Sequence, residues 1–343
     1  MFRSRLCVVL ATVALLLCLA PAGLASEASP PPPDTTMQTG VLLDMESGNV
    51  LWARDEKAIR APASLTKVLT GLVAIESSDL NKQGVISKAA RTVPGQRMFA
   101  EEGWTMTVRD MLWGLLLQSG NDAAISLAET VSPDGTVAGF MQMANARARE
   151  LGATDSNFVN PHGLDEPGHQ TTARDLALIT SAAMRNPTFV DMVSSKTHVV
   201  PWGDGRNHLF INHNKLLWRY DGTVGVKTGF TTDAGNCLIS AVQRDGRTLI
   251  AVVMGTGNHY AESTALYDWG FANLPALQSR STYSIRPDLT PQNAELEISS
   301  TRSSETAGLI AGVQIRYLIP ALAIVCLFAM GMVRRYSLFF SRT

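Results

Sequence analysis

Short strand patterns stand at both ends of the central region of this chain, and helical patterns fill the region between them. Apolar runs at 39–43 and 50–54 flank the polar turn Glu46-Ser47-Gly48-Asn49 and predict a β-hairpin. Further strands are predicted near the other end of this region, at 224–228, 236–243 and 248–255. Strands that meet from both ends around inserted helices predict an α/β fold with an antiparallel sheet flanked by helices.

The middle of the chain has the periodicity of helices. Leu65, Val68, Leu69 and Leu72 repeat at helical spacing just after Pro62, a residue suited to a helix start. Thr107 is predicted to cap a helix that runs to Leu116, and Gly120 should separate it from the next helix. The remaining helices are expected at 122–129, 133–151, 172–184 and 262–271. The central ones form an inserted helical subdomain.

The N-terminal segment is predicted to be a signal peptide, residues 1–25. Arg3 and Arg5 precede an apolar run at 6–20, and small residues that suit cleavage follow. The Pro-rich stretch 26–38 is expected to be an extended spacer. An uncleaved anchor is the alternative, although the run is shorter than the ~20 residues that a spanning helix needs.

A second apolar segment predicts a transmembrane helix at 309–334, after a catalytic body at 39–274 and a linker at 275–308. Its core, 317–333, would extend ~26 Å as a helix, close to the ~30 Å of a hydrocarbon core. Basic residues follow it in the tail 335–343, so the C-terminus is expected in the cytoplasm. The prediction is a single-pass protein of the cell membrane with an extracytoplasmic body.

Charge and cysteine content exclude some functions. The net charge is -1, without the clustered Lys and Arg of a nucleic-acid surface. Cys237 is the one cysteine in the expected extracytoplasmic body, so an internal disulfide is excluded there. Its apolar neighbours predict a buried strand residue rather than a reactive thiol.

Three short motifs carry the functional signal. They occur in the order Ser64-Leu65-Thr66-Lys67, Ser119-Gly120-Asn121 and Lys227-Thr228-Gly229. They match the S-x-x-K, S-x-N and K-T-G set of penicillin-binding proteins and class A β-lactamases. The expected contexts are a helix start, a loop between helices and a strand end. Ser47-Gly48-Asn49 resembles the second motif but precedes Ser64, in the hairpin turn, so we interpret it as a decoy.

The spacing of the first motif suits nucleophilic catalysis. Residues three apart on a helix share a face, so the Lys67 amine can reach the Ser64 hydroxyl and act as general base. A lysine takes this role only if burial or a nearby cation lowers its pKa, and Lys227 is a candidate for that cation. In the first helical turn, the Ser64 N–H can also serve an oxyanion hole.

With these motifs and with Asn160-Pro161-His162-Gly163-Leu164, the chain resembles the serine D-alanyl-D-alanine carboxypeptidases, the low-molecular-mass penicillin-binding proteins of the peptidase S11 type, over roughly 39–271. The resemblance implies their DD-peptidase/β-lactamase-like fold. It implies removal of the terminal D-alanine from peptidoglycan stem peptides through an acyl-enzyme, inhibition by β-lactams, and neither metal nor cofactor. The implied roles are a proton relay for Ser119, substrate amide binding for Asn121, carboxylate binding for Lys227, Thr228 and Gly229, and an oxyanion-hole N–H from Phe230.

Several alternatives have weaker support in the sequence. A membrane-bound class A β-lactamase would need E-x-x-L-N after Asn121, and the sequence has none there. A zinc peptidase would need H-E-x-x-H, and His208 and His213 lie in a polar, loop-like region where we expect surface residues or residues behind the site. A Ser-His-Asp hydrolase would need G-x-S-x-G. A non-catalytic penicillin-binding sensor or peptidoglycan receptor would keep the pocket without turnover.

Overall fold

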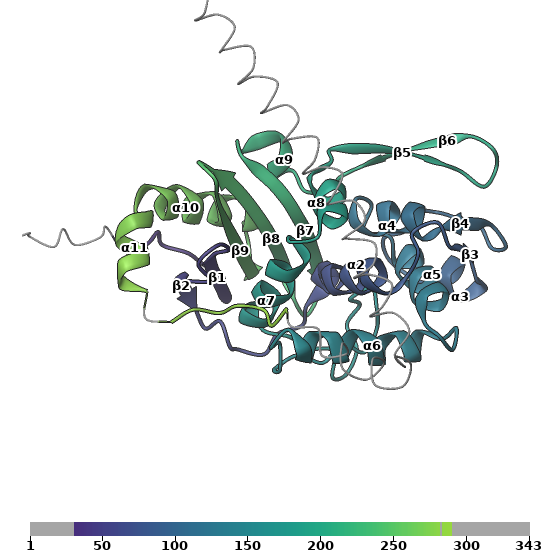
Figure 1. Cartoon of the computed structure of the whole chain (residues 1–343), viewed down its shortest axis with the longest axis horizontal. Helices are drawn as coiled ribbons and strands as arrows, with labels where there is room; N and C mark the ends of the chain where they lie inside the picture. Colours follow the sequence, from purple (N-terminus) through teal and green to yellow (C-terminus); the bar gives the residue numbers. More distant parts are fainter. Residues whose placement is uncertain (1–30, 282, 290–343) are drawn as a thin grey trace, which may run out of the picture. The chain divides into compact units, whose positions relative to one another are not determined.

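The computed structural model describes residues 31–281 and 283–289, and a five-stranded sheet lies at their centre (Figure 1). All neighbouring strands are antiparallel, in the order β2-β1-β9-β8-β7. The hairpin near residue 40 and the strands after residue 223 therefore share one sheet, which confirms the predicted antiparallel arrangement. The strands are β1 (Thr39–Asp44), β2 (Val50–Arg54), β7 (Thr223–Thr231), β8 (Gly235–Arg244) and β9 (Arg247–Thr256).

Alternation along the strands gives the sheet two buried faces. In β1, Val41 and Leu43 belong to the larger of two hydrophobic cores, on one face of the sheet. Leu42 belongs to the smaller core, on the opposite face. In β9, Val252 and Val253 divide in the same way. Successive side chains of a strand point to opposite faces, so strands that are apolar throughout need cover on both sides.

Helices supply that cover. On the smaller core lie α10 (His259–Ala272) and α11 (Leu274–Arg280), at the left of Figure 1. On the other face, α7 (Ala173–Ala183) packs against the sheet beside α2 (Thr66–Ser77). Around α2 stand the helices of the inserted region, α3 (Lys88–Thr92), α4 (Val108–Leu116), α5 (Asn121–Val131), α6 (Val137–Glu150) and α8 (Pro187–Ser194), and the short α9 (Leu216–Arg219) precedes β7.

The helix starts follow capping chemistry. Thr107 accepts a hydrogen bond from the Asp110 N–H, as predicted, and Thr136 and Thr172 cap α6 and α7 in the same way. The predicted start at Pro133 was four residues too early, because α6 begins at Val137, after the capping residue Thr136. Side-chain caps therefore fix where these helices begin.

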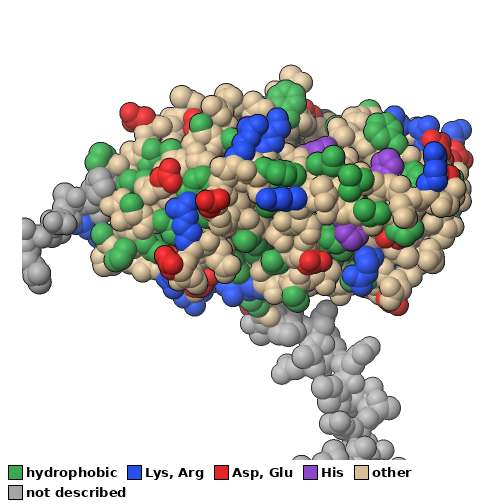
Figure 2. Space-filling model, turned by 90° about the horizontal axis from the view of Figure 1, so that it is seen from above, with side chains coloured by type: hydrophobic (Ala, Val, Ile, Leu, Met, Phe, Trp, Pro, Cys, Tyr) green, Lys and Arg blue, Asp and Glu red, His purple; other side chains and the backbone are tan. Residues whose placement is uncertain are grey.

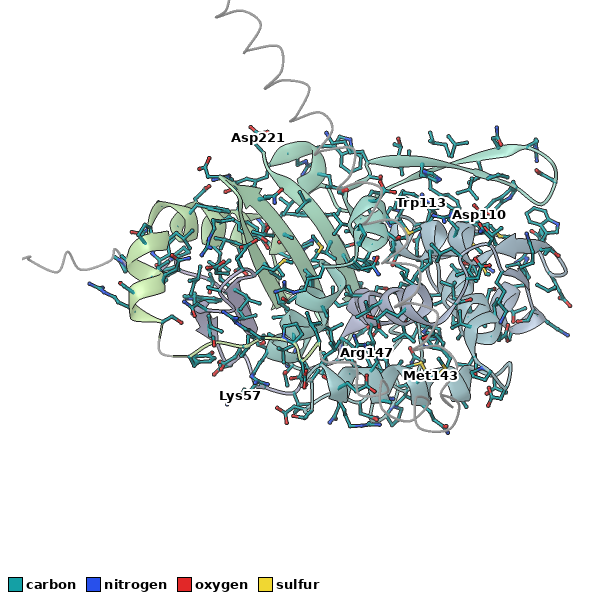
Figure 3. The ribbon with its side chains drawn as sticks, in the orientation of Figure 1. Lys57, Asp110, Trp113, Met143, Arg147 and Asp221 are labelled. Atoms are coloured by element: carbon teal, nitrogen blue, oxygen red, sulfur yellow. The ribbon has the colours of Figure 1, made fainter. Side chains whose placement is uncertain are left out.

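Two ribbons complete the fold, β3 (Gln83–Val85) with β4 (Thr105–Thr107) and β5 (Thr197–Pro201) with β6 (Asn207–Ile211). The loop-like interpretation of the region around His208 was wrong, because His208 lies in β6. One face of the β5–β6 ribbon packs inward, where His198 stacks on Trp113 with ring centroids 3.6 Å apart. Trp113, labelled in Figure 3, belongs to α4, which lies beneath the ribbon. The other face of the ribbon leaves Val199 and Leu209 about half exposed. Figure 2 shows that hydrophobic side chains are scattered over this upper side of the molecule among charged and polar ones.

The end of the described chain folds back onto the sheet, although the sequence predicted a linker from residue 275. Helix α11 buries Leu277, and Ile285 is only 3% exposed. The Ile285 N–H donates to the Gly48 carbonyl at 2.8 Å, and the Val50 N–H donates to the Tyr283 carbonyl. Apolar burial and backbone pairing extend the folded unit past 275.

The predicted signal peptide, most of the remaining linker, the transmembrane segment at 309–334 and the cytoplasmic tail lie outside the described residues. Within residues 31–281 and 283–289, no helix has both the length and the apolar character needed to cross a membrane.

Candidate active site

Ser64 lies in a single 3-10 turn, η1 (Ala63–Leu65), that leads into α2. The sequence placed it in the first α-helical turn, so the predicted position is correct to within one turn but the local geometry differs. Ala63, the first residue of this turn, has φ +50°, which lies outside the right-handed helical region, so the α-helix cannot extend back through it. Lys67 follows in α2, and its Nζ lies 3.0 Å from Ser64 Oγ, as the spacing predicts.

Three oxygen atoms surround the Lys67 amine. Besides Ser64 Oγ, Nζ contacts Asn121 Oδ1 at 2.7 Å and the His162 carbonyl at 2.5 Å. Lys67 is fully buried, and burial holds its pKa well below the usual value; the positive charge of Lys227 lowers it further, whereas Asp122 raises it. A buried, hydrogen-bonded lysine of low proton affinity suits a general base.

The third motif lies within β7 rather than at its end, because the strand runs on to Thr231. Lys227 is buried, and burial lowers its pKa to about 7. Its Nζ donates to the Thr228 carbonyl at 3.0 Å. Gly229 brings the strand against the nucleophile, since a Cβ there would lie 3.2 Å from the Ser64 nitrogen. This close approach leaves little room for any side chain at position 229.

The second motif begins in the loop between α4 and α5, as predicted, with Ser119 and Gly120 in the loop and Asn121 as the first residue of α5. Ser119 has φ +58°, a strained conformation for a residue with a Cβ, and its side chain reaches the cavity described below. Asn121 begins α5, and its Nδ2 donates to the Pro94 carbonyl at 2.7 Å while its Oδ1 accepts from Lys67. Asn121 therefore joins the second motif directly to the first.

A cavity of about 330 Å³ opens over these residues. The predicted residues Ser64, Ser119, Thr228, Gly229 and Phe230 line it, whereas Lys67, Asn121 and Lys227 are buried behind this wall. Sequence reasoning missed the other lining residues, Gln96, His213, Asn236 and His259. They come from separate segments with no shared motif, so no local signal identified them.

His213 had been assigned to the surface or to a position behind the site. The structure places it in the wall of the cavity, near Lys227, and burial with that positive charge lowers the pKa of His213 to about 4. It is therefore neutral at physiological pH. His208, by contrast, is exposed and stacks on Trp202, with ring centroids 4.7 Å apart.

The segment Asn160–Leu164 supports the two catalytic candidates from behind. The Pro161 carbonyl accepts from Thr70 Oγ1 at 2.7 Å, and the His162 carbonyl accepts from Lys67. Gly163 has φ +92°, and a Cβ there would lie 1.9 Å from the Ala63 carbonyl oxygen. Only glycine fits, and its backbone is packed directly on the turn that carries Ser64.

The decoy motif has no comparable surroundings. Ser47 Oγ donates to Asp44 Oδ2 in the β1–β2 turn, and no lysine amine contacts it in residues 31–281 and 283–289. The same described residues contain no group of three or more His, Cys, Asp or Glu side chains placed to hold a metal ion.

Comparisons with known proteins agree with this geometry. A family model described as D-alanyl-D-alanine carboxypeptidase, Peptidase S11, matches residues 25–258. D-alanyl-D-alanine carboxypeptidase DacB2 of Mycobacterium tuberculosis is 39% identical over 256 residues, covering 72% of this chain and 86% of that protein. DacF of Bacillus subtilis is 32% identical over 243 residues, which cover 68% of this chain and 62% of DacF.

Solved structures share the fold. A crystal structure of D-alanyl-D-alanine carboxypeptidase from Mycobacterium tuberculosis aligns with a TM-score of 0.68 at 37% identity, covering 72% of this chain and 95% of that one. The Streptomyces K15 DD-transpeptidase aligns with a TM-score of 0.68 at 30% identity, covering 71% of this chain and 100% of that one.

Proposed function

The chain belongs to the D-alanyl-D-alanine carboxypeptidase family, Peptidase S11, and on this premise we propose that Ser64 is the acyl-ester nucleophile with which it removes the terminal D-alanine from peptidoglycan pentapeptides. The observation that carries the proposal is the 3.0 Å contact between Ser64 Oγ and the buried amine of Lys67. A serine hydroxyl needs such a base before it can attack a carbonyl.

In the acylation step, neutral Lys67 takes the Ser64 hydroxyl proton while Oγ bonds to the carbonyl carbon between the two terminal D-alanines. The tetrahedral intermediate collapses as the C–N bond breaks, and the leaving amine of D-alanine receives a proton, with Ser119 as its relay. Water then attacks the Ser64 ester, gives its proton to the base, and releases the shortened peptide with a new carboxylate. Each proton taken up by the site is returned in the cycle.

The remaining site residues would orient the substrate. The Lys227 ammonium and the Thr228 hydroxyl bind the terminal carboxylate. Asn121 would hold the substrate amide through the second N–H of its Nδ2, because Nδ2 already donates to Pro94 and Oδ1 accepts from Lys67. The backbone N–H groups of Ser64 and Phe230 stabilise the oxyanion, and one such donor is typically worth ~3 kcal/mol of transition-state stabilisation. The close packing of Gly229 on the Ser64 nitrogen supports this arrangement, because it sets β7 beside the nucleophile.

A β-lactam ring presents the same amide to Ser64, but its leaving amine remains tethered to the acyl group. The departing group therefore stays near the ester, and the adduct clears slowly. Penicillin should inhibit the enzyme and label it covalently.

The extracytoplasmic location and the tether are further parts of the proposal. We place the body, beginning near residue 39, outside the cytoplasmic membrane after removal of residues 1–25, and anchor it by a single span at 309–334. The apolar run with basic residues after it supports this topology. Membrane fractionation of the full chain and of a chain ended before 309 tests it: the full chain should pellet with membranes and the shortened one should not.

Labelling with a fluorescent penicillin tests the nucleophile. The wild type should form a stable adduct, Ser64→Ala should form none, and Ser47→Ala should behave as the wild type. An adduct on Ser64→Ala would overturn the assignment. Release of free D-alanine from a pentapeptide separates the enzyme from a binding-only sensor, and rapid turnover of penicillin would instead indicate a β-lactamase.

A further inference from the structure

Asp122 is a buried acid whose partners are backbone groups. Its side chain is fully inaccessible. Oδ1 accepts from the Met98 and Ala123 N–H groups and Oδ2 accepts from the Phe99 N–H, each at 2.9 Å. None of the ion pairs in the described part of the chain involves it. Burial raises the pKa of the Asp122 carboxyl, whereas the hydrogen bonds from the Met98, Ala123 and Phe99 N–H groups lower it and so favour the charged form.

The contacts of Asp122 hold one loop against the active site. Met98 and Phe99 belong to the segment 93–100, whose Gln96 lines the cavity. The same segment is bonded to the neighbouring residue, because the Asn121 N–H donates to the Gln96 carbonyl and Asn121 Nδ2 donates to the Pro94 carbonyl, both at 2.7 Å. Asn121 and Asp122 together therefore fix this segment from two sides.

The bonds to the segment also fix the orientation of the Asn121 amide. Since Nδ2 is committed to Pro94, Oδ1 must face the Lys67 amine, which it contacts at 2.7 Å. If the segment moved, the Asn121 amide could rotate and Lys67 would lose an acceptor. The position of the loop is thus coupled to the position of the general base.

Several charged or titratable groups act on Lys67 from the elements packed around it. Lys227 approaches from β7, Asp122 from α5, and His162 and His169 from the loop before α7. Burial lowers the pKa of His162 to about 3 and of His169 to about 4, so both are neutral near pH 7. Among the described groups, Asp122 is the one acid that acts on Lys67, and it raises the lysine's pKa.

We propose that Asp122 is a positioning residue of the carboxypeptidase reaction: its buried carboxylate holds the segment 93–100 against Asn121 and provides the counter-charge for the Lys67 ammonium that forms when Ser64 loses its proton. The inference rests on the proposed roles of Ser64 and Lys67. It assigns Asp122 no contact with substrate.

The test is the pH dependence of acylation by a fluorescent penicillin. Acylation needs neutral Lys67, so the rate rises as pH rises through the Lys67 pKa. Asp122→Asn removes the charge that raises this pKa, and the rising, acid limb of the pH–rate profile should therefore move to lower pH. One carboxylate oxygen becomes an NH2 group, which cannot accept a hydrogen bond, so the Met98 or the Phe99 N–H loses its acceptor and the maximal rate should also fall roughly tenfold or more.

Two matched variants separate charge from packing. Asp122→Glu keeps the charge but displaces the segment, so it should lower the maximal rate and leave the acid limb in place. Asp175→Asn removes another fully buried acid, which accepts from the Asp155 N–H and Ser156 Oγ and is absent from the charges that act on Lys67. It should lower the thermal stability without moving the limb.

An acid limb that coincides in Asp122→Asn and the wild type would overturn the counter-charge role. A limb that moves as far in Asp122→Glu would overturn it as well, and this second result remains decisive if Asp122→Asn fails to fold. Covalent labelling of the Ser64→Ala variant would instead refute the proposed function itself. Failure of the Asp122 proposal and failure of the proposed function are therefore distinguishable.

Discussion

Replacing Gly163 by alanine should disable Ser64 without touching any catalytic side chain. The new Cβ would lie 1.9 Å from the Ala63 carbonyl oxygen and 3.0 Å from the Ser64 nitrogen, both backbone atoms that cannot rotate away. Restoring a normal contact requires the turn η1 to shift by about 1 Å, and a misplacement of ~1 Å in a reacting group can lower a rate ~10²-fold. We therefore expect acylation to slow about a hundredfold.

A second glycine provides the control. Gly168 also has a left-handed backbone, φ +80° against +92° for Gly163, but a Cβ there would meet nothing closer than 3.7 Å. Both substitutions should destabilise the fold by ~1–2 kcal/mol through backbone strain alone. Only Gly163→Ala should also slow labelling by fluorescent penicillin, measured as a second-order rate constant beside the melting temperature. Equal labelling rates for the two variants would refute the argument that Gly163 sets the position of Ser64.

Three further predictions concern titratable groups. Lys67→Arg keeps a cation that cannot take a proton, so the acylation rate should fall ~10²- to 10⁴-fold, and stopped-flow labelling at near wild-type rate would contradict the base assignment. Lys227 has a pKa of about 7, so it is charged below that pH and neutral above it. The KM for a D-alanyl-D-alanine peptide should therefore rise above pH 7, whereas the KM for its C-terminal amide analogue should not change with pH. Burial raises the pKa of the Cys237 thiol to about 11, and a thiol reagent should therefore modify the protein only after unfolding; prompt modification of the native protein would show that the residue is accessible.

Local sequence patterns were sufficient for much of the fold. The hairpin at 39–54, the cap at Thr107, the helix expected at 172–184 and the strands β8 and β9 depend on neighbouring residues, and each was predicted within a few residues. The β5–β6 ribbon was missed because its outer face is apolar yet exposed, with Val199 and Leu209 about half accessible, so its strands lack the apolar–polar alternation expected of a half-buried strand. Its order comes from contacts such as that of His198 with Trp113, far away in the chain.

The same division applies to the site. Ser64 and Lys67 are one helical turn apart, so their contact follows from the sequence alone, and the order of the three motifs made the family recognisable. The tertiary structure alone decided that the Lys67 amine also meets Asn121 and the His162 carbonyl, that Gly163 and Gly229 press on the Ser64 turn, and that His213 and His259 line the cavity. These contacts join residues far apart in the chain, and several use backbone atoms, which every residue type carries and which therefore leave no signature in the sequence.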